Sequence, residues 1–243
     1  MESYTLPSFP STYSTIHIAL FENVTNSSEI KERLVKASIT PGEQGDKLRS
    51  ELDYGFIEAS VLVSKEHLLT SIMTTLLYSF PSQSNDPASI SLEPLSMSNS
   101  SPNHAVDSPS NPPISSLSSA DASNTQVKPK TRTHNLHSEL LLSLSPNNNI
   151  TDSIRRHGIS DQTKTLAVVR ISGSDQTPEQ VYQGISRVVK GDLVGWDKIE
   201  NVTDWNRVDK IYKLSEINSL KSPDVRAKKR AAVVSSVAVK NVI

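Results

Sequence analysis

Two histidines three residues apart, His134 and His137, stand close to Glu139 and could in principle offer nitrogen and oxygen ligands to a metal ion. A zinc site needs more ligands than this pair supplies, and the pattern has no third, distant ligand. The chain contains no cysteine, which excludes disulfides, thiolate nucleophiles and cysteine-ligated metal centres. We therefore interpret the histidines as exposed polar residues at a helix start, and we expect no metal site.

Motifs for nucleotide binding or covalent catalysis are also missing. The segment GEQGDK at residues 42–47 lacks both the spacing of a P-loop and a flanking strand. No dinucleotide fingerprint and no GxSxG nucleophile elbow occur. His67 and His157 lie beside apolar helical positions, where a partly buried, hydrogen-bonded histidine is expected rather than a catalytic one. The sequence predicts no catalytic residue and no cofactor, and it favours a binding or scaffold protein.

The middle of the chain has the composition of a linker. Residues 80–130 hold 15 serines and 8 of the 14 prolines, and residues 67–126 contain no lysine or arginine. Such a segment buries too little apolar surface to offset the ordering cost of about 1–2 kcal/mol per residue. We predict a disordered Ser/Pro/Asn-rich insertion over residues 81–129, inside a single domain formed by residues 1–80 and 130–243.

Charge is distributed unevenly although the net charge is −1. Residues 1–127 carry 6 basic and 14 acidic side chains, whereas residues 128–243 carry 19 and 12. The acidic first part or the basic second part of the chain could steer a charged partner. Solvent-exposed helix faces that bind no partner would give the same distribution of charge. No apolar run approaches the roughly 18 residues of a membrane span, and the first twenty residues lack a signal-peptide pattern. An intracellular protein without a membrane partner is expected.

Periodicity and capping residues predict an α/β (α+β) fold: a small, mostly antiparallel sheet packed with about six to eight helices. Around Pro178, Thr177 and Gln180 have the spacing of a capping box, which marks a helix start. Residues 55–63 fit a strand or a short helix equally well. The expected strands cover residues 15–24 and 165–171, and the expected helices cover residues 28–37, 64–80, 138–145, 149–157, 177–190, 204–214 and 223–241.

Two longer runs are more specific than these patterns. They are KTRTHNLHSELLLSLSPNNNITDSIRRHGIS at residues 130–160 and RVDKIYKLS at residues 207–215. Together they resemble the PRPK-binding protein family, whose members are the small kinase-binding subunit of the EKC/KEOPS complex. The resemblance also takes in LPSFPSTYSTIHIALFENV at residues 6–24 and VLVSKEHLLTSI at residues 61–72. It covers essentially the whole chain except the insertion, which short members of the family lack.

The resemblance implies a non-catalytic regulatory subunit. Family members bind and stimulate the atypical Ser/Thr kinase-like ATPase subunit, and through it they join the threonylcarbamoyl-transferase subunit and the other KEOPS subunits. The complex forms threonylcarbamoyl-adenosine in tRNAs that read codons beginning with adenine, and the subunit helps to recruit the tRNA 3′ tail. Yeast-like members are also linked to telomere maintenance and transcription. The resemblance therefore implies a location in the nucleus, including telomeric chromatin, and in the cytoplasm.

Candidate contact residues follow from the local physical chemistry. An apolar face near the end of the last helix would mark a protein interface, and these residues are the kinase-interface candidates: Val233, Val234 and Val237. Amide and guanidinium groups near a helix start could contact phosphates or bases, and these residues are the RNA-contact candidates: Asn147, Asn148, Asn149, Arg155 and Arg156.

Each candidate set has an alternative interpretation. The three asparagines could form a tight capping turn without any RNA contact. The basic segment at residues 226–230, RAKKR, could serve nuclear import or RNA binding, or could simply be the solvent-facing first turn of the last helix. The alternative function for the whole chain is a stand-alone RNA-binding module that uses the basic second half.

Overall fold

The computed structural model describes residues 1–81, 127–218 and 223–240. The described residues from 1 to 81 and from 129 onward form one compact unit. The predicted insertion therefore lies almost entirely outside the described residues, and its disorder stays a prediction. None of the helices in the described ranges combines the length and the hydropathy needed to cross a bilayer.

An antiparallel sheet of five strands forms the centre of the fold, which confirms the predicted mixed fold class. The strand order is β1-β2-β4-β3, and β5 also pairs with β2. β1 pairs with residues 15–18 of β2 and β5 with residues 20–22, so the two short strands follow one another along β2. The strands are β1 (Glu2–Thr5), β2 (Thr15–Glu22), β3 (Gly55–Glu58), β4 (Leu166–Ser172) and β5 (Asp192–Val194).

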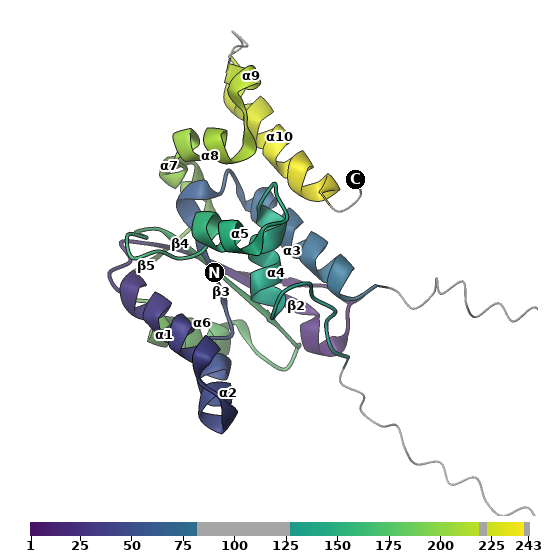
Figure 1. Cartoon of the computed structure of the whole chain (residues 1–243), viewed down its shortest axis with the longest axis vertical. Helices are drawn as coiled ribbons and strands as arrows, with labels where there is room; N and C mark the ends of the chain where they lie inside the picture. Colours follow the sequence, from purple (N-terminus) through teal and green to yellow (C-terminus); the bar gives the residue numbers. More distant parts are fainter. Residues whose placement is uncertain (82–126, 219–222, 241–243) are drawn as a thin grey trace, which may run out of the picture. The chain divides into compact units, whose positions relative to one another are not determined.

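Helices cover both faces of the sheet, as Figure 1 shows. One face of β2 and β4 packs against α3 and α4, and the other packs against α1, α2 and α6. The alternation of side chains along each strand separates these two cores: Ile18 and Val169 belong to the first, whereas Ala19 and Val168 belong to the second. The helices of these layers are α1 (Ser27–Ile39), α2 (Gly42–Glu51), α3 (Lys65–Ser79), α4 (Leu136–Leu144) and α6 (Pro178–Val188).

A further group of helices lies beside α3 and α4. It contains α5 (Ile150–His157), α7 (Ile199–Val202), α8 (Trp205–Tyr212), α9 (Ser215–Asn218) and α10 (Val225–Val239). The described residues thus hold ten α-helices, two of which are only four residues long. Short 3-10 helices occur at Ser11–Tyr13, Ala59–Val61 and Trp196–Lys198.

Capping residues set several helix boundaries as predicted. The Thr177 hydroxyl accepts a hydrogen bond from the Gln180 backbone, and the Gln180 side chain accepts one from the Thr177 backbone, which completes the capping box of α6. Ser64 caps α3. The ambiguous residues 55–63 form strand β3 followed by a 3-10 turn.

Candidate functional site

Helix α10 packs on α3, and its buried valines lie four residues apart. Val233 and Val237 are 0% and 1% exposed, whereas Val234 is only partly buried. Val233 belongs to a small cluster with residues of neighbouring elements: Val63, Val208 and Leu214. The expectation that Val233 and Val237 present an apolar face to a partner is therefore wrong, because α10 turns this face towards its own domain.

The basic first half of α10 is anchored to other helices. Lys229 is buried, donates to the Asp209 carboxylate at 2.7 Å, and lies 5.7 Å from the centre of the Trp205 ring. Arg230 forms an ion pair with Glu200 of α7. Two of the five residues in the RAKKR segment thus hold α10 against α7 and α8, so this segment is more than a solvated turn. Its predicted nuclear-import and RNA roles stay predictions.

Lys240 ties the other end of α10 to the turn between α4 and α5. Its ammonium donates to the carbonyl oxygen of Asn147 at 2.8 Å and to that of Leu142. Burial lowers the pKa of Lys240 to about 8, and the nearby Arg132 charge acts in the same direction. Carbonyl groups at the end of a helix carry partial negative charge, which suits a cation there. The position of α10 is thereby coupled to the turn at residues 145–149.

That turn is a compact hydrogen-bonded cap. The Asn149 side chain accepts a hydrogen bond from the Asp152 backbone and so caps α5. The Asn147 side chain accepts one from the Asn149 backbone at 3.1 Å and donates one to the Asp152 carboxylate at 2.8 Å. Asn147 and Asn149 therefore act locally as capping residues, which was the alternative interpretation of this run.

The two arginine candidates bind the same carboxylate. Arg155 and Arg156 both form ion pairs with Asp152, the second at 2.7 Å. Hydrogen bonds from Arg155, Asn147 and Arg156 hold the pKa of Asp152 well below its usual range. The Arg155 side chain is nevertheless 74% exposed, and Asn148 is exposed on the turn beside it. The structure brings all five candidates together around the start of α5, and their RNA contact stays a prediction.

A buried hydrogen-bond relay lies beneath this turn. The Tyr212 hydroxyl donates to the Leu144 carbonyl at 2.5 Å and contacts Nε2 of His67 at 3.0 Å. Nδ1 of His67 accepts from the Val63 backbone amide at 3.5 Å, so the proton of the neutral ring is on Nε2 and points to Tyr212. His157 packs edge-on against the same tyrosine ring.

The relay joins the two sequence runs that carry the family resemblance. Tyr212 lies in RVDKIYKLS, and Leu144 begins LSPNNNI. Burial lowers the pKa of His67 to about 3 and that of His157 to about 4, and it raises the pKa of Tyr212. All three groups are therefore uncharged near neutral pH. Both histidines are more deeply buried than expected, with 0% exposure, and they occupy structural positions in the core.

The side chains of His134, His137 and Glu139, which were considered as possible metal ligands, do not meet at one point. Nε2 of His137 contacts the Asp53 carboxylate at 2.7 Å, His134 is exposed, and Glu139 is buried. Across the part of the chain that the structure describes, no three histidine, aspartate or glutamate side chains form a metal-binding group. Of the histidine pair, only His137 has a role in the local structure, through its contact with Asp53.

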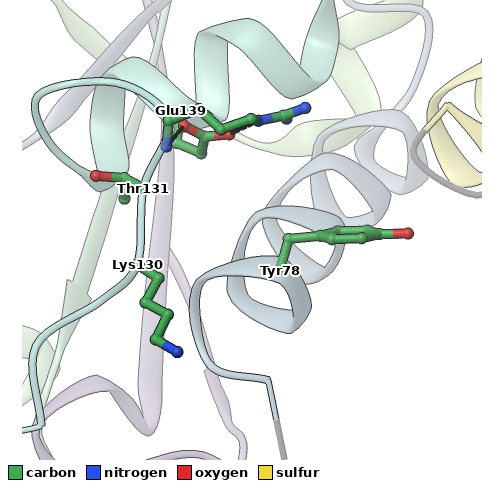
Figure 2. Close-up of a pocket in the computed structure, with 5 residues that line it drawn as sticks. Tyr78, Lys130, Thr131 and Glu139 are labelled. Carbon is green, nitrogen blue, oxygen red and sulfur yellow. Dashed lines mark hydrogen bonds and ion pairs between the residues drawn. The ribbon is translucent and has the colours of Figure 1, made fainter.

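Glu139 instead forms the inner wall of a hollow of about 360 Å³ between α3 and the segment that leads into α4. Its carboxylate accepts hydrogen bonds from the Arg132 backbone and from Nε of Arg132, at 3.0 and 2.8 Å. Figure 2 shows Lys130 extending below this ion pair and the Tyr78 ring projecting from α3. Basic groups suit a nucleic-acid phosphate and an aromatic ring suits a base, and residues of both kinds line this hollow.

Sequence reasoning missed Tyr212, Lys240 and most residues of this hollow, and it considered Glu139 only as a possible metal ligand. Tyr212 lies inside one of the two runs that carry the resemblance, so its residue type could have marked it as a candidate. The sequence around Lys240 does not indicate its role, because its contact with Asn147 spans 93 residues of sequence.

Comparison with known proteins gives consistent matches. The family model described as Kinase binding protein CGI-121 matches residues 21–99 and 114–241. A protein of Cryptococcus neoformans named EKC/KEOPS complex subunit CGI121 is 56% identical over 243 residues, which is 100% of both chains. That match includes residues 81–129.

More distant fungal proteins have the same name. The chain is 27% identical over 231 residues to EKC/KEOPS complex subunit CGI121 of Candida albicans, covering 90% of this chain and 87% of the relative. It is 26% identical over 210 residues to EKC/KEOPS complex subunit cgi121 of Aspergillus terreus, covering 85% and 78%.

Proposed function

The chain belongs to the CGI-121 family of kinase-binding proteins, and from that premise we propose that it is a subunit of an EKC/KEOPS complex that docks on the kinase-like subunit. The observation that carries this proposal is the 56% identity over the full length to a protein with that name. A kinase-binding role is consistent with the absence of recognisable catalytic motifs in the sequence.

The docking surface is proposed to lie on α3 and α10. Leu69, Met73 and Leu77 recur every four residues along one face of α3, and Leu77 is 58% exposed. Tyr78 beside it is 45% exposed, and Val239 at the end of α10 is 43% exposed. Since α10 packs on α3, these apolar side chains lie on neighbouring helices. Apolar residues gathered on one surface are typical of protein interfaces.

Contact with RNA is proposed as a second contribution of this subunit. Lys130, Arg132 and Tyr78 all line the hollow of Figure 2, and Asn148 and Arg155 are exposed on the α5 cap. These groups suit the phosphates and unstacked bases of a single-stranded tRNA 3′ tail. Stimulation of the kinase-like subunit and support for threonylcarbamoyl-adenosine formation belong to the same proposal. So do action in the nucleus and cytoplasm, and roles at telomeres and in transcription.

The test of docking is a binding titration of the purified full chain against its cognate kinase-like subunit. Leu77→Glu places a charge in the proposed surface, and we expect it to weaken binding by about tenfold or more. Ile39→Glu is the matched control, because Ile39 is 75% exposed on α1, in the layer that covers the opposite face of the sheet. No complex at micromolar concentration with the wild-type chain would refute the function. Equal effects of both variants would refute the surface.

A further inference from the structure

One end of the sheet face beneath α6 is polar rather than apolar. Along β2 and β4, Phe21 pairs with Leu166 and Ala19 with Val168, as expected for a packed face. The next pair on the same face is His17 with Arg170. His17 is fully buried between the hydroxyl groups of Ser3 and Ser172. Burying polar side chains in a sheet costs free energy unless they form hydrogen bonds. The change from apolar pairs to the pair His17 and Arg170 on this face therefore needs an explanation.

The Arg170 guanidinium is held in place by neighbouring groups. It donates to the backbone carbonyl of Asp53 at 2.5 Å and forms an ion pair with the Asp53 carboxylate. It also lies 5.6 Å from the centre of the Tyr54 ring. Asp53 is held in turn by His137. The cation is therefore fixed at the edge of α6, where it borders a cavity.

That cavity has a volume of about 520 Å³ and a mostly polar wall. Arg170 and Tyr54 line it, and α6 contributes Arg187 together with amide side chains. Gln180 and Gln183 are the amide residues of α6, and Gln176 lies just before this helix. Arg170 and Arg187 both line this cavity, so it contains two guanidinium groups.

Only one acidic side chain, Asp175, lines the cavity beside these two arginines. Arg170 is paired with Asp53, but Arg187 has no carboxylate within 4 Å among the described residues. The cavity therefore offers a cation whose charge is not yet balanced, next to donors and acceptors supplied by three glutamines and a tyrosine.

We propose that this cavity binds a phosphate monoester of about mononucleotide size. Arginine is well suited to phosphate because its planar fork of N–H donors matches the phosphate oxygens. Glutamine amides both donate and accept, so they suit the hydroxyl groups of a sugar or the edge of a base. The volume lies within the roughly 300–1,000 Å³ of small-molecule sites. A mostly polar wall makes an apolar ligand a poor fit.

The site is separate from the proposed docking surface. Its residues come from α2, β4, α6 and the segments before β3 and α6, whereas docking was assigned to α3 and α10. Failure to bind a phosphate monoester would thus leave the docking proposal intact. Failure to bind the kinase-like subunit would likewise leave the phosphate-monoester proposal intact.

The test is an NMR titration of the isotopically labelled full chain with adenosine monophosphate, uridine monophosphate, ribose 5-phosphate and inorganic phosphate as probes. We expect saturable shifts of the side-chain amide resonances of Gln180 and Gln183 with the nucleotides or the sugar phosphate. Arg187→Gln should weaken this binding by about tenfold or more. Arg226→Gln, a change at an exposed arginine of α10, should leave it unaltered.

A second variant tests the position of the ligand. A methyl group at Gly184 would collide with the Tyr54 hydroxyl, so Gly184→Ala should displace the tyrosine and also weaken binding. Absence of saturable shifts with every probe would overturn the proposal. It would also be overturned if Arg187→Gln bound as well as wild type, or if inorganic phosphate bound as tightly as the larger probes.

Discussion

The hydroxyl of Tyr212 donates to the carbonyl of Leu144 at 2.5 Å, across 68 residues of sequence. This bond closes the relay through His67 and holds α8 against the end of α4. The α4 end also receives Lys240 from α10. The helices proposed to face the kinase-like subunit are therefore positioned by buried polar contacts as well as by apolar packing. Such contacts are costly to leave incomplete.

Tyr212→Phe should destabilise the chain. The change keeps the ring but leaves the Leu144 carbonyl and the Nε2 proton of His67 without partners in a buried site. We expect a loss of about 1–3 kcal/mol in the free energy of unfolding, measured by urea denaturation. Tyr182→Phe, at a tyrosine that is 38% exposed on α6, is the matched control and should change little.

Stability should fall as the pH drops below about 6.5. The pKa values of His67 and His157 are lowered from 6.5 to about 3 and about 4, so the unfolded chain binds more protons than the folded one in that interval. The stabilisation is complete above the unfolded pKa and is lost on acidification towards the folded pKa. Each histidine contributes up to about 1.4 kcal/mol per pH unit.

Urea denaturation at several pH values would measure this dependence. His157→Leu should reduce the slope by about 1.4 kcal/mol per pH unit, since it removes one of the two groups. His134→Leu is the control, because it removes a histidine that is exposed instead of buried. A wild-type stability that stays flat between pH 6.5 and 4 would argue against neutral buried histidines.

Local patterns predicted much of the fold but little of the site. The capping box at Thr177 and the cap at Asn149 depend on residues three positions apart, so a single stretch of sequence contains the whole interaction. The buried face of α10 was mispredicted because residues 231–239, AAVVSSVAV, place apolar side chains all round the helix. Its rotation is set by distant partners such as Asp209, which binds Lys229. Sequence periodicity does not contain that information.

Two valines of α10 should separate stability from docking. Val237→Glu buries a carboxylate at a position that is 1% exposed, and we expect it to lower the free energy of unfolding by at least about 2 kcal/mol. Val239→Glu, at 43% exposure, should leave stability nearly unchanged and weaken binding to the kinase-like subunit. Thermal unfolding and a binding titration of both variants would test this, and a stable Val237→Glu variant would contradict the buried position.

Two neighbouring asparagines of the α5 cap allow RNA contact to be tested separately from the stability of the fold. Asn149 caps the helix through the Asp152 amide, so Asn149→Ala should cost about 1 kcal/mol of stability. Asn148 is exposed beside it, and Asn148→Ala should leave stability unchanged. If this turn contacts the tRNA 3′ tail, Asn148→Ala should weaken binding of a single-stranded oligonucleotide ending in that tail sequence, measured by fluorescence anisotropy. If instead Asn148→Ala binds like wild type, the asparagine run is a helix cap without direct RNA contact at its most accessible residue.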